Sequence, residues 1–220
     1  MTRWLALSLA IVLTGGLGAR DGAGSVHRPL DLPSGGVGAE GDDEDAPETI
    51  RFFGVSYEGD AFFWCFDRSN SMSPHINTVK QELNSAISQL SREAEFSVVR
   101  FSTGVSKWSS LPKRATALNK NLASTWVNST SIGGGTCITP AVIQTLEIAS
   151  FSRKPLRRLI LLGDGVPACE GGETTLEDVT NANYESIPID TIYVGQSEEG
   201  HELFQDIANL NDGTFSTPSP

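Results

Sequence analysis

Apolar runs of strand length alternate with segments of helical period from residue 50 to residue 217. Two of these runs, 61–66 and 159–162, are apolar at every position, as expected of central strands that are covered on both faces. Further strand patterns lie at 95–102, 105–109, 189–194 and 214–216. The alternation predicts an α/β domain with a Rossmann-like, doubly wound sheet. We expect a mainly parallel six-stranded sheet with one antiparallel strand, 105–109, and helices on both faces.

Segments of helical spacing separate these strands. In the clearest one, Ser73 and Pro74 predict the helix start, and apolar side chains recur at steps of three or four from Ile76 to Leu90. The other helices are predicted over 115–127, from Thr139 and Pro140 onward, from the capping box of Thr174 and Glu177 to about Tyr184, and over 201–209.

The start of the chain differs in composition from the rest. Residues 1–18 combine Arg3, an apolar run and small residues, which is the layout of a secretory signal peptide cleaved after Gly18. That run is too short for a bilayer span and no later segment is longer, so we expect no membrane insertion of the mature chain. Residues 19–49 are rich in glycine, proline and acid, which predicts a disordered tether. The pattern indicates a secreted or periplasmic protein whose folded domain occupies 50–217.

Charge and cysteine content exclude several classes of function. The chain has 27 acidic and 16 basic residues and a formal net charge of -11, so it would repel nucleic acids and anionic lipid surfaces. Its three cysteines and three histidines lack the spacing of a structural zinc or iron–sulfur site. Any metal would therefore have to be held by oxygen atoms.

Polar side chains follow the predicted central strands, at the edge where parallel sheets bind ligands. Asp67, Ser69 and Ser71 follow the first buried strand, and Asp164 follows the second. Thr136 ends a glycine-rich loop that precedes a predicted helix. Such oxygen ligands suit a small hard cation, Mg²⁺ or Mn²⁺. Because hydroxyl groups do not cancel the charge of the metal, we expect it to attract a carboxylate from a partner protein.

These pieces together resemble the metal-ion-dependent adhesion site of the von Willebrand factor type A family, over residues 50–217. The residues that carry the resemblance are Asp67-Arg68-Ser69-Asn70-Ser71, Thr136 after three glycines, and Asp164-Gly165. The resemblance implies direct metal ligation by Ser69 and Ser71, and direct or water-mediated contact from Thr136. It implies mainly water-mediated contact from Asp67 and Asp164. Members of this family mostly bind other proteins through the metal, without covalent chemistry.

The chain departs from the family pattern at several points. Asn70 stands where glycine is common, which is tolerable because asparagine accepts left-handed backbone angles. Gly163 stands where threonine is common, and this change is expected to be neutral. No helix is predicted after 214–216, so the helix displacement that switches integrin inserted domains is not expected. The strand-like segment 51–56 resembles that of secreted bacterial members and has no predicted place in the sheet.

Cys137 adjoins Thr136, and Cys169 lies five residues beyond Asp164, so both cysteines fall on loops at the metal edge. In an oxidising compartment this placement favours a disulfide between them, which would brace the edge. Cys65 lies within a buried strand and is expected to be an inert thiol.

The favoured function is a secreted, cation-dependent adhesion or scaffold module that captures a partner's Asp or Glu carboxylate. Two other functions compete with it. One is a structural or assembly domain whose metal site is vestigial. The other is a phosphoesterase that uses Asp67 as its nucleophile, although such enzymes need a second acid where Ser69 stands. The sequence also lacks a GxSxG elbow and the lysine of a P-loop. We therefore expect a binding module and not an enzyme.

Overall fold

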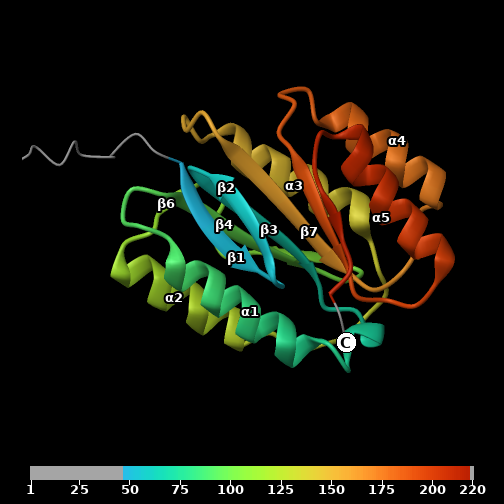
Figure 1. Cartoon of the computed structure of the whole chain (residues 1–220). Helices are drawn as coiled ribbons and strands as arrows, with labels where there is room; N and C mark the ends of the chain where they lie inside the picture. Colours follow the sequence, from blue (N-terminus) through green and yellow to red (C-terminus); the bar gives the residue numbers. More distant parts are fainter. Residues whose placement is uncertain (1–46, 219–220) are drawn as a thin grey trace, which may run out of the picture. The chain divides into compact units, whose positions relative to one another are not determined.

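The computed structural model describes residues 47–218, which contain one large mixed sheet (Figure 1). Its strands are β3 Ala61–Asp67, β4 Glu95–Phe101, β5 Val105–Lys107, β6 Lys113–Arg114, β7 Arg157–Gly163, β8 Ile189–Tyr193 and β9 Phe215–Ser216. They lie in the order β5-β4-β3-β7-β8-β9, with β6 also paired to β4. Strands β5 and β6 are antiparallel to β4, and every other pairing is parallel.

The predicted fold class is confirmed, and the sheet has one strand more than the six expected. The additional strand, β6, consists of Lys113 and Arg114, which are both exposed. It is defined by antiparallel pairing with Phe96 and Glu95 of β4. No apolar pattern marks such a strand, because neither of its side chains enters the core.

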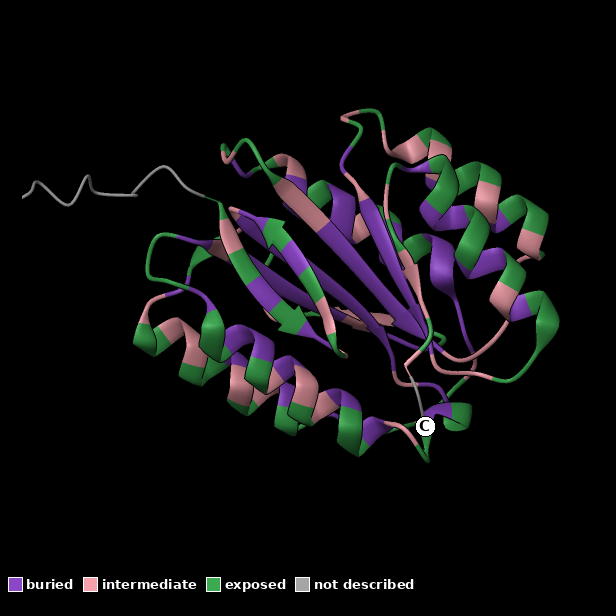
Figure 2. Ribbon diagram, in the orientation of Figure 1, coloured by how far each residue is buried: buried purple, intermediate pink, exposed green. Residues whose placement is uncertain are grey.

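Alternate side chains of the central strand β3 enter two different layers of the core. The helices are α1 Ile76–Gln89, α2 Ala117–Asn128, α3 Ile138–Ser150, α4 Gly172–Ala182 and α5 Glu198–Leu210. Phe62, Trp64 and Phe66 pack in the layer of α1 and α2, whereas Phe63 and Cys65 pack in the layer of α3, α4 and α5. Every residue of β3 is buried, as the colouring in Figure 2 shows for the central strands.

A separate two-stranded hairpin lies over the sheet face beside α1 (Figure 1). Its strands are β1 Glu48–Phe52 and β2 Val55–Gly59. Ile50, Phe52 and Tyr57 are at most 2% exposed and join the same core layer as α1 and α2. The strand-like segment expected at 51–56 is therefore the turn region of a hairpin that covers the sheet, outside the sheet itself.

Helix α1 covers the β1 edge of this hairpin with polar side chains. Glu82 Oε2 accepts a hydrogen bond from the Phe53 N–H at 2.8 Å, and Gln89 Oε1 accepts one from the Arg51 N–H at 2.7 Å. The Gln89 side-chain amide also donates to the Arg51 carbonyl at 3.0 Å. These bonds satisfy backbone groups that an open strand edge would leave unpaired.

A partly buried ion pair joins the hairpin to strands β7 and β8 of the sheet. Asp190 in β8 is fully buried and accepts two hydrogen bonds from Arg158 of β7, at 2.8 and 2.6 Å. Arg158 Nε donates to the Glu58 carbonyl of β2 at 2.7 Å. Thr214, just before β9, donates to Asp190 through its N–H and its hydroxyl. One network therefore links β2, β7, β8 and the chain leading into β9.

Several helices begin at residues other than those predicted. Ser73 does not cap α1, which begins at Ile76, because Asn70–Met72 first forms a short 3-10 helix. Thr139 and Thr174, predicted as helix caps, lie inside α3 and α4. The loops after the strands decide where each helix starts, and the capping pattern alone does not contain their geometry.

The predicted signal peptide, 1–18, and nearly all of the predicted tether, 19–49, lie outside the described residues. Strand β1 begins at Glu48, so the last residues assigned to the tether belong to the hairpin. Across residues 47–218, every helix falls short of the length and apolar character that a membrane crossing requires.

We expect Phe52→Ala to lower the free energy of unfolding by about 3 kcal/mol, because it leaves a cavity beside Trp64. Arg51→Ala, at the exposed neighbouring position, is the matched control and should change stability by less than about 0.5 kcal/mol. Urea unfolding followed by tryptophan fluorescence measures both. If Phe52→Ala lowers the free energy of unfolding as little as Arg51→Ala does, the hairpin contributes little to the stability of the domain.

Candidate metal-binding site

The first loop of the site begins at Asp67, the last residue of β3. Its side chain is fully buried, and its Oδ1 accepts a hydrogen bond from the Ser69 N–H at 2.6 Å. The chain turns here so that the hydroxyl oxygens of Ser69 and Ser71 lie 3.0 Å apart. The Arg68 N–H donates to the Phe101 carbonyl of β4 at 2.7 Å and fixes the loop to the sheet.

Asp164 brings a second loop to the same place. It follows β7, and its Oδ1 accepts a hydrogen bond from the Ser71 hydroxyl at 2.9 Å. A Cβ at the preceding residue, Gly163, would come within 2.8 Å of the Phe204 ring of α5. The glycine that stands where the resemblance would place threonine therefore makes room for Phe204.

The glycine-rich loop before α3 is the third part of the site. The Gly133 N–H donates to the Arg68 carbonyl at 2.9 Å, and the Asn70 N–H donates to the Gly134 carbonyl at 3.2 Å. Gly134 has a φ of 88°, and a Cβ there would lie 2.9 Å from Thr103 Oγ1. Only glycine satisfies both the backbone angle and the close approach.

Burial governs the protonation of the two carboxylates. Burial raises the pKa of Asp67 from 3.8 to about 7; the polar groups of Ser69 and Thr136 oppose this rise, and the charge of Asp164 adds to it. Burial also raises the pKa of Asp164, against the lowering effects of the Ser71 hydrogen bond and of nearby His75. Both acids are therefore easier to protonate than exposed carboxylates.

One carboxylate oxygen of Asp67 has no hydrogen-bond partner among residues 47–218. Within the described residues, its Oδ2 is buried and makes no hydrogen bond. An unpaired carboxylate oxygen is costly to bury, so this position favours a cation or an ordered water molecule. The groups around it, Ser69, Ser71, Thr136 and Asp164, offer only oxygen atoms, which suit Mg²⁺ or Mn²⁺.

Hydroxyl groups would have to take part in binding such a cation. Among residues 47–218, no group of three or more His, Cys, Asp or Glu side chains is placed to hold a metal ion. The structure instead brings the predicted residues to one edge of the sheet on three loops: Asp67, Ser69, Ser71, Thr136 and Asp164. This donor set fits an oxygen-ligated divalent ion.

Two residues beside this edge, Thr103 and His75, were not predicted from the sequence to belong to the site. Thr103 Oγ1 accepts a hydrogen bond from the Gly135 N–H at 2.9 Å and ties the glycine-rich loop to the end of β4. Its place just beyond a strand that ends at the same edge is a signal that could have identified it. No comparable signal marks His75. Its position near Asp164 depends on the conformation of the loop before α1, which the sequence pattern does not predict.

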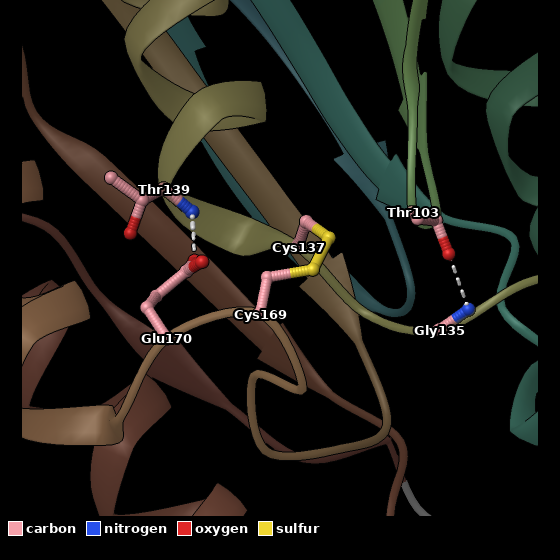
Figure 3. The surroundings of a disulfide bond; sticks show 6 residues. All are labelled: Thr103, Gly135, Cys137, Thr139, Cys169 and Glu170. Carbon is pink, nitrogen blue, oxygen red and sulfur yellow. Dashed lines mark hydrogen bonds between the residues drawn. A yellow bond between two sulfur atoms is a disulfide. The ribbon is translucent and has the colours of Figure 1, made fainter.

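A disulfide joins the glycine-rich loop to the loop that follows β7 (Figure 3). The Cα atoms of Cys137 and Cys169 lie 5.2 Å apart, a usual separation for a disulfide. The disulfide expected from the sequence is therefore present. Cys65 is a free thiol buried in β3, and burial raises its pKa to about 12, which leaves it protonated and unreactive.

Two hydrogen bonds hold the 164–171 loop beside this disulfide. Glu170 Oε1 accepts a hydrogen bond from the Thr139 N–H at 3.0 Å, close to the disulfide in Figure 3. The Ala168 N–H donates to the Thr136 carbonyl at 2.7 Å. The loop that carries Asp164 is thus attached at three points to the chain that carries Thr136.

A comparison with known protein families identifies the family of this domain. The family model of the von Willebrand factor type A domain matches residues 63–217. The chain belongs to the von Willebrand factor type A domain family. Among curated protein sequences, none matches it significantly. The hairpin β1–β2 precedes the matched residues, so the family match does not account for it.

Solved structures share the fold of this von Willebrand factor type A domain at low sequence identity. A von Willebrand factor type A protein from Catenulispora acidiphila is 20% identical, with a TM-score of 0.67, over 75% of this chain and 40% of that protein. The pilus adhesin SpaC from Lactobacillus rhamnosus GG, in its open conformation, is 13% identical, with a TM-score of 0.62, over 74% of this chain and 28% of SpaC. The domain thus spans less than half of either protein.

A pilus protein matches over most of its length. The von Willebrand factor domain of the type V pili tip protein Mfa5 from Porphyromonas gingivalis is 9% identical, with a TM-score of 0.58. The match covers 78% of this chain and 91% of that domain. At such identities these likenesses establish the fold of the von Willebrand factor type A domain and leave its ligand to be inferred from the site.

In the presence of chelator, we expect the free energy of unfolding to fall as the pH rises through about 7. The folded domain keeps a proton on Asp67 up to a pKa of about 7, whereas the unfolded chain releases it near 3.8, so protonation favours folding. From pH 5.5 to 8.5 the loss should be on the order of 2 kcal/mol larger for the wild type than for Asp67→Asn. Urea unfolding measures it, and parallel pH profiles of the two proteins would contradict the assignment.

Reduction of the disulfide should lower the free energy of unfolding by about 3 kcal/mol, because the bond closes a loop with a sequence separation of 32. We also expect faster amide exchange in the 164–171 loop. The double variant Cys137→Ser/Cys169→Ser should show both effects without reductant and no further response to it. Equal stability of the oxidised and reduced proteins would contradict the bracing role.

Proposed function

We propose that this domain is a secreted protein-binding module that captures an Asp or Glu carboxylate of a partner at a bound Mg²⁺ or Mn²⁺. Ser69, Ser71 and Thr136 would supply hydroxyl ligands. Asp67 and Asp164 would hold the ion mainly through water. The observation that carries this proposal is the convergence of three loops around the buried, unpaired Oδ2 of Asp67.

The chemistry of the donors explains why a partner carboxylate would complete the site. When bound, the divalent ion would supply a strong local attraction for an anion, because neutral hydroxyl ligands leave most of its charge uncancelled. Ser69 and Ser71 would be aligned for this by the Asp67 carboxylate, which accepts the Ser69 N–H. The net charge of -11 would repel acidic proteins at long range, so the attraction is confined to contact distances.

We infer the location of the protein from the signal-peptide pattern at residues 1–18 and from the Cys137–Cys169 disulfide, a bond typical of oxidising compartments. Both support export to the periplasm or the exterior. Two proteins of similar fold are a pilus adhesin and a pilus tip protein. Their roles support adhesion or scaffolding as the use of this domain.

One observation favours a second candidate, a structural or assembly domain with a vestigial site. The Ser71 hydroxyl donates directly to Asp164, so two proposed ligands satisfy each other without a metal. This alternative leaves the unpaired Oδ2 of Asp67 without an explanation. A phosphoesterase has weaker support, because a nucleophilic Asp67 would need to reach substrate and its exposure is 0%.

Isothermal titration of Mg²⁺ into the purified protein tests the proposal. The wild type should bind with measurable heat, and Asp67→Ala and Ser69→Ala should each weaken binding at least about tenfold, or about 1.4 kcal/mol. Ser73→Ala, an exposed residue beyond the loop, is the control and should bind as the wild type does. A wild type without heat or thermal shift would leave the vestigial site as the better account.

A further inference from the structure

A cavity of about 380 Å³ opens at the same end of the domain as the candidate metal-binding site. Its walls come from the turn of the β1–β2 hairpin, the start of α1 and the residues after β8, with Pro218 on one side. The lining residues from these three segments are Phe53, His75, Thr78, Val194, Gly195 and Gln196. We call this cavity the hairpin pocket.

The hairpin pocket adjoins the site through the backbone. A Cβ on Gly195 would come within 1.9 Å of the Asp164 carbonyl oxygen, so this wall of the pocket lies directly against the Asp164 loop. The His75 N–H donates to the Met72 carbonyl at 2.9 Å, and Met72 follows Ser71. The pocket wall is therefore continuous with two loops of the site, which places the pocket beside a carboxylate bound there.

The chemistry of the lining favours a largely apolar occupant. Phe53, Val194 and Pro218 offer apolar surface, while Thr78 and Gln196 add neutral polar groups. Among the described residues, His75 is the one titratable side chain in the lining, and no Asp, Glu, Lys or Arg joins it. A cationic side chain would lose its hydration there without gaining a partner, whereas an apolar one gains free energy from burial.

We propose that the hairpin pocket binds an aromatic side chain of the partner, next in sequence to the acid that the metal captures. This proposal rests on the proposed function and specifies the partner as a protein with an acidic–aromatic pair. A pocket of this volume lies in the usual range for ligand sites. Phe53 lies outside the family match, so one wall of the pocket comes from a segment that the family model does not cover.

Short blocked peptides test the proposal at saturating Mg²⁺, with affinities measured by NMR titration. The probes are acetyl-Asp-Phe-amide, acetyl-Phe-Asp-amide, acetyl-Asp-Ala-amide and acetyl-Asn-Phe-amide. We expect the better of the two acidic–aromatic peptides to bind about tenfold more tightly than the Asp-Ala peptide. The Asn-Phe peptide should bind more weakly than the Asp-Phe peptide, because it lacks the carboxylate.

Two matched variants assign the effect to the pocket. Thr78→Trp places a bulky side chain at the pocket wall, whereas Asn77→Trp places it at the neighbouring exposed position of α1, which does not line the pocket. Both should keep the Mg²⁺ affinity of the wild type. The aromatic preference should vanish in Thr78→Trp and persist in Asn77→Trp.

The outcomes separate the pocket from the site. Equal binding of the acidic–aromatic and Asp-Ala peptides would overturn the hairpin pocket and leave carboxylate capture intact. An unchanged preference in Thr78→Trp would do the same. If no acidic peptide binds a protein that binds Mg²⁺, both the pocket and the proposed capture are overturned.

Discussion

A carboxylate buried at the end of the central strand, with one oxygen unpaired, is the constraint on which this structure depends. Asp67 gives Oδ1 to the backbone of its own loop and leaves Oδ2 without a partner among the described residues. Such a group is unfavourable unless it meets a proton, a water molecule or a cation. The three loops around it contribute hydroxyls and a second acid, so the local chemistry favours a hard cation over further protein contacts.

The rest of the domain positions these loops. The parallel pairing of β3 with β4 and β7 brings their carboxyl ends to one edge, where Asp67, Thr103 and Asp164 follow or end the strands. The Cys137–Cys169 disulfide and neighbouring hydrogen bonds attach two of the loops to each other. The β1–β2 hairpin packs in the core layer of α1 and α2, and its turn reaches the edge of the sheet that carries the site. An element outside the family match therefore lies next to the site.

Sequence patterns predicted the features that depend on burial and on strand order. The apolar runs located the central strands, and the polar residues after them, Asp67 and Asp164, located the edge of the site. The short strand β6, the role of His75 and the hairpin over the sheet could not be predicted in this way. Each depends on tertiary contact: β6 has no buried side chain, and the hairpin's Ile50 and Phe52 are buried by a face that only the fold creates.

The central claim is that hydroxyl groups and buried acids form a competent cation site, and a crystal structure in Mn²⁺ tests it most directly. The account predicts an anomalous peak among Ser69, Ser71 and Thr136, and replacement of the direct bond between Ser71 and Asp164. A structure at high Mn²⁺ without an anomalous peak there, with Ser71 still bonded to Asp164, would contradict it.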